Sequence, residues 1–239
     1  MRPPGCRVHV YANTLGCEAV SIITIQGGTF DSENHIYRDE AGVFVPSLTQ
    51  VLKLQGLSDY SNIEPSVLEN AARRGTEVHE LAATYNMDPD GLDPSWITEE
   101  TAPYFSAYMD FLRDTGFKPD PQWVEKSMIA TINGYKIGLT PDCFGTRGRE
   151  KWLVEFKCTA ARQPSWTVQT AMQEAAIFQS NRCGRVRRFA LMLMKTGRYD
   201  LGVEHTNHER DMQAGMDALR TVYWRIEAGQ DLMRKVSGE

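Results

Sequence analysis

GLTPD at residues 138–142 is followed, after a short turn, by VEFK at residues 154–157, and these two stretches are the most informative part of the sequence. Each stands late in a run with the composition of a β-strand, and runs joined by a short turn pair as a hairpin. Such pairing brings Asp142, Glu155 and Lys157 to one end of a sheet. Two carboxylates beside a lysine can hold a divalent cation and activate water against a phosphodiester.

Alternation along residues 151–158 separates two faces of the second strand. Trp152, Val154, Phe156 and Cys158 share an apolar face, which we expect to be the core side. Glu155 and Lys157 share the opposite face with Leu153, so the charged pair is aimed in one direction. The alternative interpretation is a surface ion pair at a strand end, in which Lys157 pairs with Glu155 or Asp142.

The rest of the chain predicts an α/β protein with a mixed central β-sheet flanked by helices. Helices are expected over residues 48–54 (with Ser47 as N-cap and Gly56 as the stop), 66–85, 98–115 (ended by Gly116), 166–180 (capped by Ser165) and 207–228. Strands are expected over 21–26, 35–38, 42–45, 123–132, 135–144, 151–158, 189–194 and 199–203, with an Asn133-Gly134 hairpin turn. Residues 1–20 are expected to be an accessory or loosely ordered N-terminus, and residues 21–239 a single domain.

Composition bounds the class of protein. The 239 residues are 41% hydrophobic and 24% charged, which is ordinary for a soluble globular protein, and no run has the length of a membrane helix. No signal peptide is apparent at the N-terminus, and the five cysteines are odd in number and lack CxxC spacing. We therefore expect reduced thiols in a cytoplasmic protein, without a zinc ribbon or a disulfide scaffold.

Four motifs together resemble one family. Pro141-Asp142 followed by Glu155-x-Lys157 resembles the PD-(D/E)xK nuclease superfamily, and the RGTEVH sequence ending at His79 resembles the helix-borne Gly-Thr-x-Val-His motif of its RecB-type members. Gln169 falls where that subgroup carries a Gln-x-x-x-Tyr motif, although this chain has Gln173 in place of the tyrosine. VPSLTQVL at residues 45–52 is similar to the opening of phage-encoded nucleases of this type.

The resemblance implies a restriction-endonuclease-like core and a divalent-metal-dependent deoxyribonuclease that leaves 5′-phosphate and 3′-hydroxyl ends. It favours an exonuclease of phage or prophage recombination in the bacterial cytoplasm. Its partner would be DNA, together with a single-strand annealing or recombination protein and no membrane, and the oligomeric state is left open. The alternatives are a metal-dependent endonuclease, a nuclease-fold protein that binds nucleic acid without cutting it, and a plain α/β protein with chance matches.

The same resemblance assigns roles to individual residues. Asp142, Glu155, His79 and the backbone carbonyl of Phe156 would hold one or two Mg²⁺ or Mn²⁺ ions. Lys157 would act on the attacking water, Gln169 would position Lys157 or a nucleotide, and Glu125 would be a supporting carboxylate or the ligand of a second ion. A single histidine on the inner face of a helix is otherwise a core residue. No cysteine triplet follows Cys183, so no iron–sulfur cluster is expected.

The net charge of −5 offers DNA no attractive overall field, so binding would depend on local basic residues. A basic island is formed by Arg182, Arg185, Arg187, Arg188, Lys195 and Arg198. The candidate phosphate contacts are Arg73, Arg74, Arg162, Arg187 and Arg188. The alternative for the island is an ordinary solvated surface.

Overall fold

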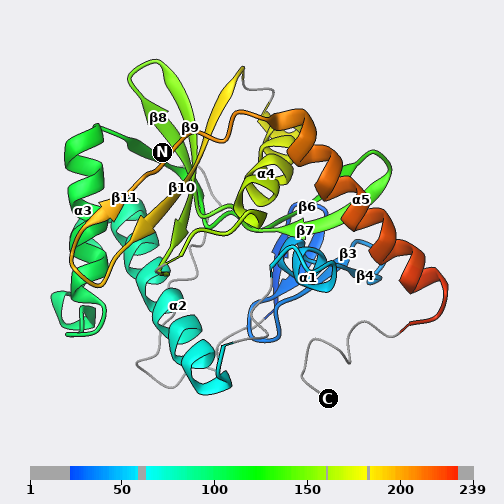
Figure 1. The fold of residues 1–239 in the computed structure, drawn as a ribbon, viewed down its shortest axis with the longest axis horizontal. Coiled ribbons are helices and arrows are strands. Elements are labelled where there is room, and N and C mark those ends of the chain that lie inside the picture. Colours follow the sequence, from blue (N-terminus) through cyan, green and yellow to red (C-terminus); the bar gives the residue numbers. More distant parts are fainter. Residues whose placement is uncertain (1–21, 59–62, 160, 182–183, 231–239) are drawn as a thin grey trace, which may run out of the picture.

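The computed structural model describes residues 22–58, 63–159, 161–181 and 184–230. The predicted accessory segment 1–20 lies outside these residues, as do Cys6, Cys17, Arg182 and Cys183. The described part is a mixed α/β structure with three β-sheets and five α-helices (Figure 1). Within it, no helix combines the length and hydrophobicity that crossing a bilayer requires.

The largest sheet has five strands in the order β11-β10-β9-β8-β5. These are β5 (Lys118–Val124), β8 (Cys143–Arg147), β9 (Glu150–Lys157), β10 (Val186–Leu193) and β11 (Tyr199–Asp200). β8 and β9 form the expected antiparallel hairpin, whereas β9 and β10 run parallel because α4 (Ser165–Asn181) crosses over between them. The prediction of a mixed sheet is therefore confirmed.

Helices cover both faces of this sheet (Figure 1). α2 (Pro65–Met87) and α3 (Ala102–Thr115) pack on the face that carries Trp152, Val154 and Phe156, as the alternation of β9 predicts. α4 covers the opposite face, where Leu153 packs against Ile177. α5 (His208–Glu227) packs on α4. The face of β9 that carries Glu155 is consequently buried as well, and Glu155 is only 3% exposed.

Two smaller sheets lie beside the main one. β6 (Met128–Ile132) and β7 (Tyr135–Leu139) form a hairpin whose turn residues Asn133 and Gly134 have φ of 48° and 85°, the left-handed values that an Asn-Gly turn predicts. The second is an antiparallel meander of β1 (Ile22–Ile25), β2 (Gly28–Asp31), β3 (Ile36–Asp39) and β4 (Phe44–Val45). α1 (Leu48–Leu54) follows, with the expected Ser47 cap.

Several predicted boundaries are wrong. The runs 123–132 and 135–144 are not continuous strands, because the chain breaks at Glu125 (φ 46°) and again at 140–142, where Pro141 has no N–H to pair. Asp142 thus precedes β8 instead of lying late in a strand. α3 starts at Ala102, Ser165 is the first residue of α4 and not its cap, and two short 3₁₀ turns (Pro89–Gly91 and Pro94–Trp96) precede α3. β2 was not predicted, and β11 is shorter than the predicted strand 199–203.

Candidate metal centre

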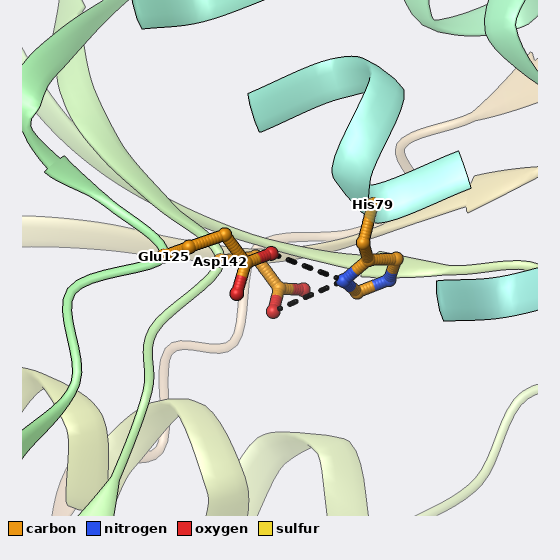
Figure 2. A group of neighbouring side chains, drawn as sticks. All are labelled: His79, Glu125 and Asp142. Carbon is orange, nitrogen blue, oxygen red and sulfur yellow. Dashed lines mark hydrogen bonds and ion pairs between the residues drawn. The ribbon is translucent and has the colours of Figure 1, made fainter. Parts of the chain in front are cut away.

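One histidine and two carboxylates meet at the end of the main sheet (Figure 2). His79 comes from the middle of α2, Glu125 from the residue after β5, and Asp142 from the residue before β8. His79 Nδ1 lies 3.2 Å from Glu125 Oε1 and 3.5 Å from Asp142 Oδ1. The three donor atoms lie within 4.8 Å of one another. One imidazole nitrogen and two carboxylate oxygens fit a divalent cation.

Backbone pairing explains why Glu125 and Asp142 are neighbours. The N–H of Glu125 donates to the carbonyl oxygen of Asp142 at 3.0 Å, and Val124 pairs with Cys143 across a bulged β5–β8 ladder. Glu125 adopts a left-handed φ of 46°, which is uncommon for a residue with a side chain and is typical of functional positions. This conformation ends β5 at the point where the cluster begins.

Asp142 is held at a second point by β9. Its Oδ2 accepts a hydrogen bond of 2.5 Å from the backbone N–H of Phe156, and Asp142 is 5% exposed. Because Cys143 pairs with Val154, Asp142 and Glu155 lie at the same end of the hairpin, as the sequence predicts. The backbone of Phe156 therefore lies at the centre, while a role for its carbonyl as a metal ligand stays a prediction.

Glu155 lies beside the three-residue cluster and is held by α4. Its Oε1 accepts hydrogen bonds from Lys157 Nζ, at 3.0 Å, and from Gln169 Nε2, and its Oε2 accepts one from Gln173 Nε2 at 2.8 Å. Lys157 Nζ also donates to Gln169 Oε1 at 3.1 Å, which is the contact expected of a positioning glutamine. Glu125, predicted as a supporting residue, is thus a member of the cluster. Glu155 lies next to the cluster, where the side-chain amides of Gln169 and Gln173 donate to it.

Gln173 was noted only as a departure from the family's tyrosine. It is 1% exposed and lies one helical turn after Gln169, so the two amides reach the same carboxylate. The i, i+4 spacing of the two glutamines on one helix was the signal that could have paired them. Ligation of a metal by Glu155 stays a prediction, because both of its oxygens already accept hydrogen bonds.

The electrostatics of the centre favour a bound cation. Burial raises the pKa of Asp142 well above its ordinary value, and the charge of Glu155 raises it further. Burial alone would lower the pKa of His79, but the charge of Asp142 and the hydrogen bond to Glu125 outweigh it and raise the pKa to about 9. The carboxylates thus favour a positive charge at His79, and a divalent cation at this position would supply it.

A chain of three hydroxyl groups, which no sequence pattern indicates, supports the segments that carry Glu125 and Asp142. Tyr37 Oη lies 2.7 Å from Thr140 Oγ1, which lies 2.8 Å from Ser127 Oγ. Thr140 stands two residues before Asp142 and Ser127 two residues after Glu125. A side chain at Gly138 would collide with the Tyr37 ring, so this glycine is needed for the contact. The β1–β4 meander thereby fixes the two breaks between strands.

The predicted role of Arg188 as a DNA contact is wrong, because its side chain is 2% exposed. Its guanidinium forms ion pairs with Glu174 at 3.2 Å and with Asp211 at 3.3 Å, and donates to the carbonyl oxygen of Thr167 at 2.9 Å. Arg188 lies in β10, so these contacts join the strand to both α4 and α5. The positive charge of Arg188 is therefore paired inside the fold.

The other candidate arginines carry acidic partners. Arg187 pairs with Glu150 and Glu204, and its guanidinium lies over the Trp152 ring at 5.5 Å from the centroid. Arg185 also pairs with Glu204, so much of the basic island is neutralised, although Lys195 and Arg198 are exposed. Arg162 pairs with Asp200. Arg73 and Arg74 precede His79 on α2, and both pair with Glu100.

Comparison with known proteins assigns this sequence to no family. No protein-family model matches the sequence, and a search of curated proteins finds no match either.

Proposed function

We propose that this protein is a divalent-metal-dependent nuclease of the RecB-type PD-(D/E)xK kind, which hydrolyses DNA phosphodiesters as an exonuclease of phage or prophage recombination. One observation carries the proposal: the partly buried cluster of His79, Glu125 and Asp142 lies beside Glu155 and Lys157 at one end of a mixed sheet. The order β8, β9, α4, β10 with a parallel β9–β10 pair is compatible with a restriction-endonuclease-like core.

In this proposal His79, Glu125 and Asp142 hold one or two Mg²⁺ or Mn²⁺ ions, and Glu155 and the Phe156 carbonyl complete the ligand set. A bound divalent cation neutralises charge on the phosphate and lowers the pKa of a water molecule. Asp142 keeps its place through the Phe156 N–H, and Glu155 through Gln169 and Gln173. The ligands are thus positioned before substrate arrives, which is what electrostatic catalysis needs.

Lys157 is the residue that acts on the reacting atoms. Its ammonium group lies 3.0 Å from Glu155 and 3.1 Å from Gln169, and 6.0 Å from the centre of the Trp166 ring. These contacts hold the ammonium group of Lys157 at the end of the sheet where Asp142 lies. There it orients the attacking water or stabilises the charge that develops on the phosphate.

The thiols next to the centre support water as the nucleophile. Burial raises the pKa of Cys158 to about 12 and raises that of Cys143 well above its ordinary range. A thiol acts as a nucleophile only as the thiolate, so neither cysteine is suited to covalent catalysis at neutral pH. A water molecule activated among carboxylates is the remaining nucleophile of this arrangement.

The test is incubation with linear and circular DNA, each single- and double-stranded, in Mg²⁺, Mn²⁺ or EDTA, with Lys157→Met as the inactive control. We expect metal-dependent loss of linear DNA and survival of closed circles. Linearisation of circles would indicate an endonuclease instead. Binding of DNA without any cleavage in either metal would overturn the proposed activity.

A further inference from the structure

Two neighbouring arginines of α2 share one carboxylate. Arg73 Nη2 lies 2.7 Å from Glu100 Oε2, and Arg74 Nη1 lies 3.5 Å from Glu100 Oε1. Both arginines stand on the helix that carries His79, and Glu100 belongs to the turn before α3. One anion is thus enclosed between two guanidinium groups close to the candidate metal centre.

The arrangement holds this carboxylate weakly. The side chains of Arg73 and Glu100 are 50% and 40% exposed, and ion pairs this exposed contribute about 0–1 kcal/mol. Arg74 makes the longer contact, and its buried Nε has no hydrogen-bond partner among the described residues. Because a buried donor without an acceptor is costly, another anion that engages Arg74 more fully would be favoured.

The surroundings suit a phosphate as well as a carboxylate. Guanidinium groups bind phosphate oxygens through the same forked geometry that they use for carboxylates. Glu100 also lies two residues before Ala102, the first residue of α3, where the helix dipole favours a negative charge. The two guanidinium groups therefore converge on the position of the Glu100 carboxylate, close in sequence to the start of α3.

Arg74 also lies on the side of the molecule where the proposed chemistry takes place. The charges of Arg74, Asp142 and Lys157 all act on the pKa of the Cys158 thiol, which follows β9. Around the centre itself the charges are mostly acidic, with Glu125, Asp142 and Glu155 close together. A nucleic acid strand that reaches this centre needs cations outside it, and Arg74, together with Arg73 across the shared Glu100 carboxylate, can supply them.

We propose that Glu100 occupies a phosphate-binding site, and that a backbone phosphate of a bound DNA strand displaces it from Arg73 and Arg74. This inference rests on the proposed function, because it names how that substrate is held. In the free protein Glu100 screens the two arginines from other anions. When DNA binds, a backbone phosphate forms ion pairs with the two guanidinium groups, and the Glu100 side chain turns to solvent.

The test measures binding of a fluorescently labelled single-stranded oligonucleotide in EDTA, so that no cleavage occurs. Glu100→Gln removes the competing charge, and Glu99→Gln removes an equal charge from the adjacent, exposed residue. We expect Glu100→Gln to bind about three- to tenfold more tightly than wild type, with a log–log salt slope steeper by about 0.7. Glu99→Gln should change the affinity much less, since it only alters the net charge.

A double-mutant cycle that combines Glu100→Gln with substitutions of both arginines distinguishes displacement of Glu100 by phosphate from a general effect of charge. In an Arg73→Gln/Arg74→Gln background binding should be weaker, and Glu100→Gln should then have no further effect. Equal effects of Glu100→Gln and Glu99→Gln, or a full effect of Glu100→Gln without the arginines, would overturn the inference alone. Absence of DNA binding by wild type in EDTA would also overturn the inference alone, because the proposed function is decided by cleavage in Mg²⁺ or Mn²⁺.

Discussion

The backbone N–H of Phe156 donates to Asp142 Oδ2 at 2.5 Å, so a side chain that precedes β8 completes the hydrogen bonding at the end of β9. The other oxygen of Asp142 faces His79 at 3.5 Å. One buried carboxylate therefore serves the fold with Oδ2 and the candidate metal centre with Oδ1. Substitutions of Asp142 must be chosen so that these two contributions are measured separately.

Asp142→Asn and Asp142→Ala should differ in stability but not in metal response. The asparagine keeps an oxygen that can accept from Phe156 and removes a charge that Glu155 repels, so the metal-free melting temperature should not fall. The alanine leaves the Phe156 N–H without an acceptor, which should cost about 1–3 kcal/mol. Both variants should lose the Mn²⁺-induced rise in melting temperature. Full Mn²⁺ stabilisation of the Asn variant would remove Asp142 from the ligand set.

Glu125→Gln should weaken Mn²⁺ binding at least about tenfold, because it removes one of two anionic donors next to His79. Glu80→Gln is the matched control, since Glu80 is an exposed residue whose carboxyl interacts electrostatically with Glu125 but does not belong to the cluster. Calorimetric titration with Mn²⁺ compares the two. Equal losses in both variants would mean that Glu125 acts through its charge alone, without coordinating the ion.

The elements that the sequence predicts well are those with local signals. The Ser47 cap fixes the start of α1, Asn133-Gly134 fixes the β6–β7 turn, and the alternation of β9 identifies the face that packs on α2 and α3. The convergence of Asp142 and Glu155 follows from hairpin pairing, which requires only a short turn. These features depend on residues close together in the chain.

The features that the sequence missed depend on distant contacts. Residues around Glu125 have strand-forming neighbours and no glycine, so nothing local marks the break that brings Glu125 to His79. Pro141 did mark the break before Asp142, but the apolar run around it outweighed that signal. Arg188 reads as a surface cation until Glu174 and Asp211, from two other elements, surround it.

Lys157→Met should abolish turnover while leaving metal binding intact or tighter. The methionine keeps the length of the side chain and removes a positive charge from the neighbourhood of the ligands, whereas the transition state loses its cation. Gln169→Ala, which removes the Lys157 contact at 3.1 Å, should lower kcat by a smaller factor. Single-turnover cleavage at saturating Mn²⁺ provides the comparison. If turnover survives in Lys157→Met, the lysine has no catalytic role.

Arg188→Met should destabilise the fold without changing DNA affinity. Removing the buried cation leaves Glu174 with His208 and Asp211 with Arg210 as their remaining basic partners, so the cost should be up to about 3–5 kcal/mol, the range for a broken buried pair. Arg187→Met removes a neighbouring cation whose side chain is 31% exposed, and should cost less than about 1 kcal/mol. Urea denaturation measures both. Loss of DNA affinity by folded Arg188→Met would reinstate it as a DNA contact.

The last prediction concerns His205, whose Nδ1 lies 2.9 Å from Thr170 Oγ1. Burial, helped by the charge of Arg188 and opposed by that of Asp211, lowers the pKa of His205 from 6.5 to about 4. His205 is therefore protonated below about pH 6.5 in the unfolded chain, but only below about pH 4 in the folded protein.

The stability that neutral His205 contributes is therefore complete above pH 6.5 and is lost as the pH falls toward 4, by up to about 3 kcal/mol. His205→Gln does not titrate and keeps an amide within reach of Thr170, so its stability should fall less over the same range. Urea unfolding of both proteins between about pH 7 and pH 4 gives the comparison. The wild-type curve should fall more steeply than the His205→Gln curve as the pH falls; curves that stay parallel would show that His205 titrates alike in the folded and unfolded states.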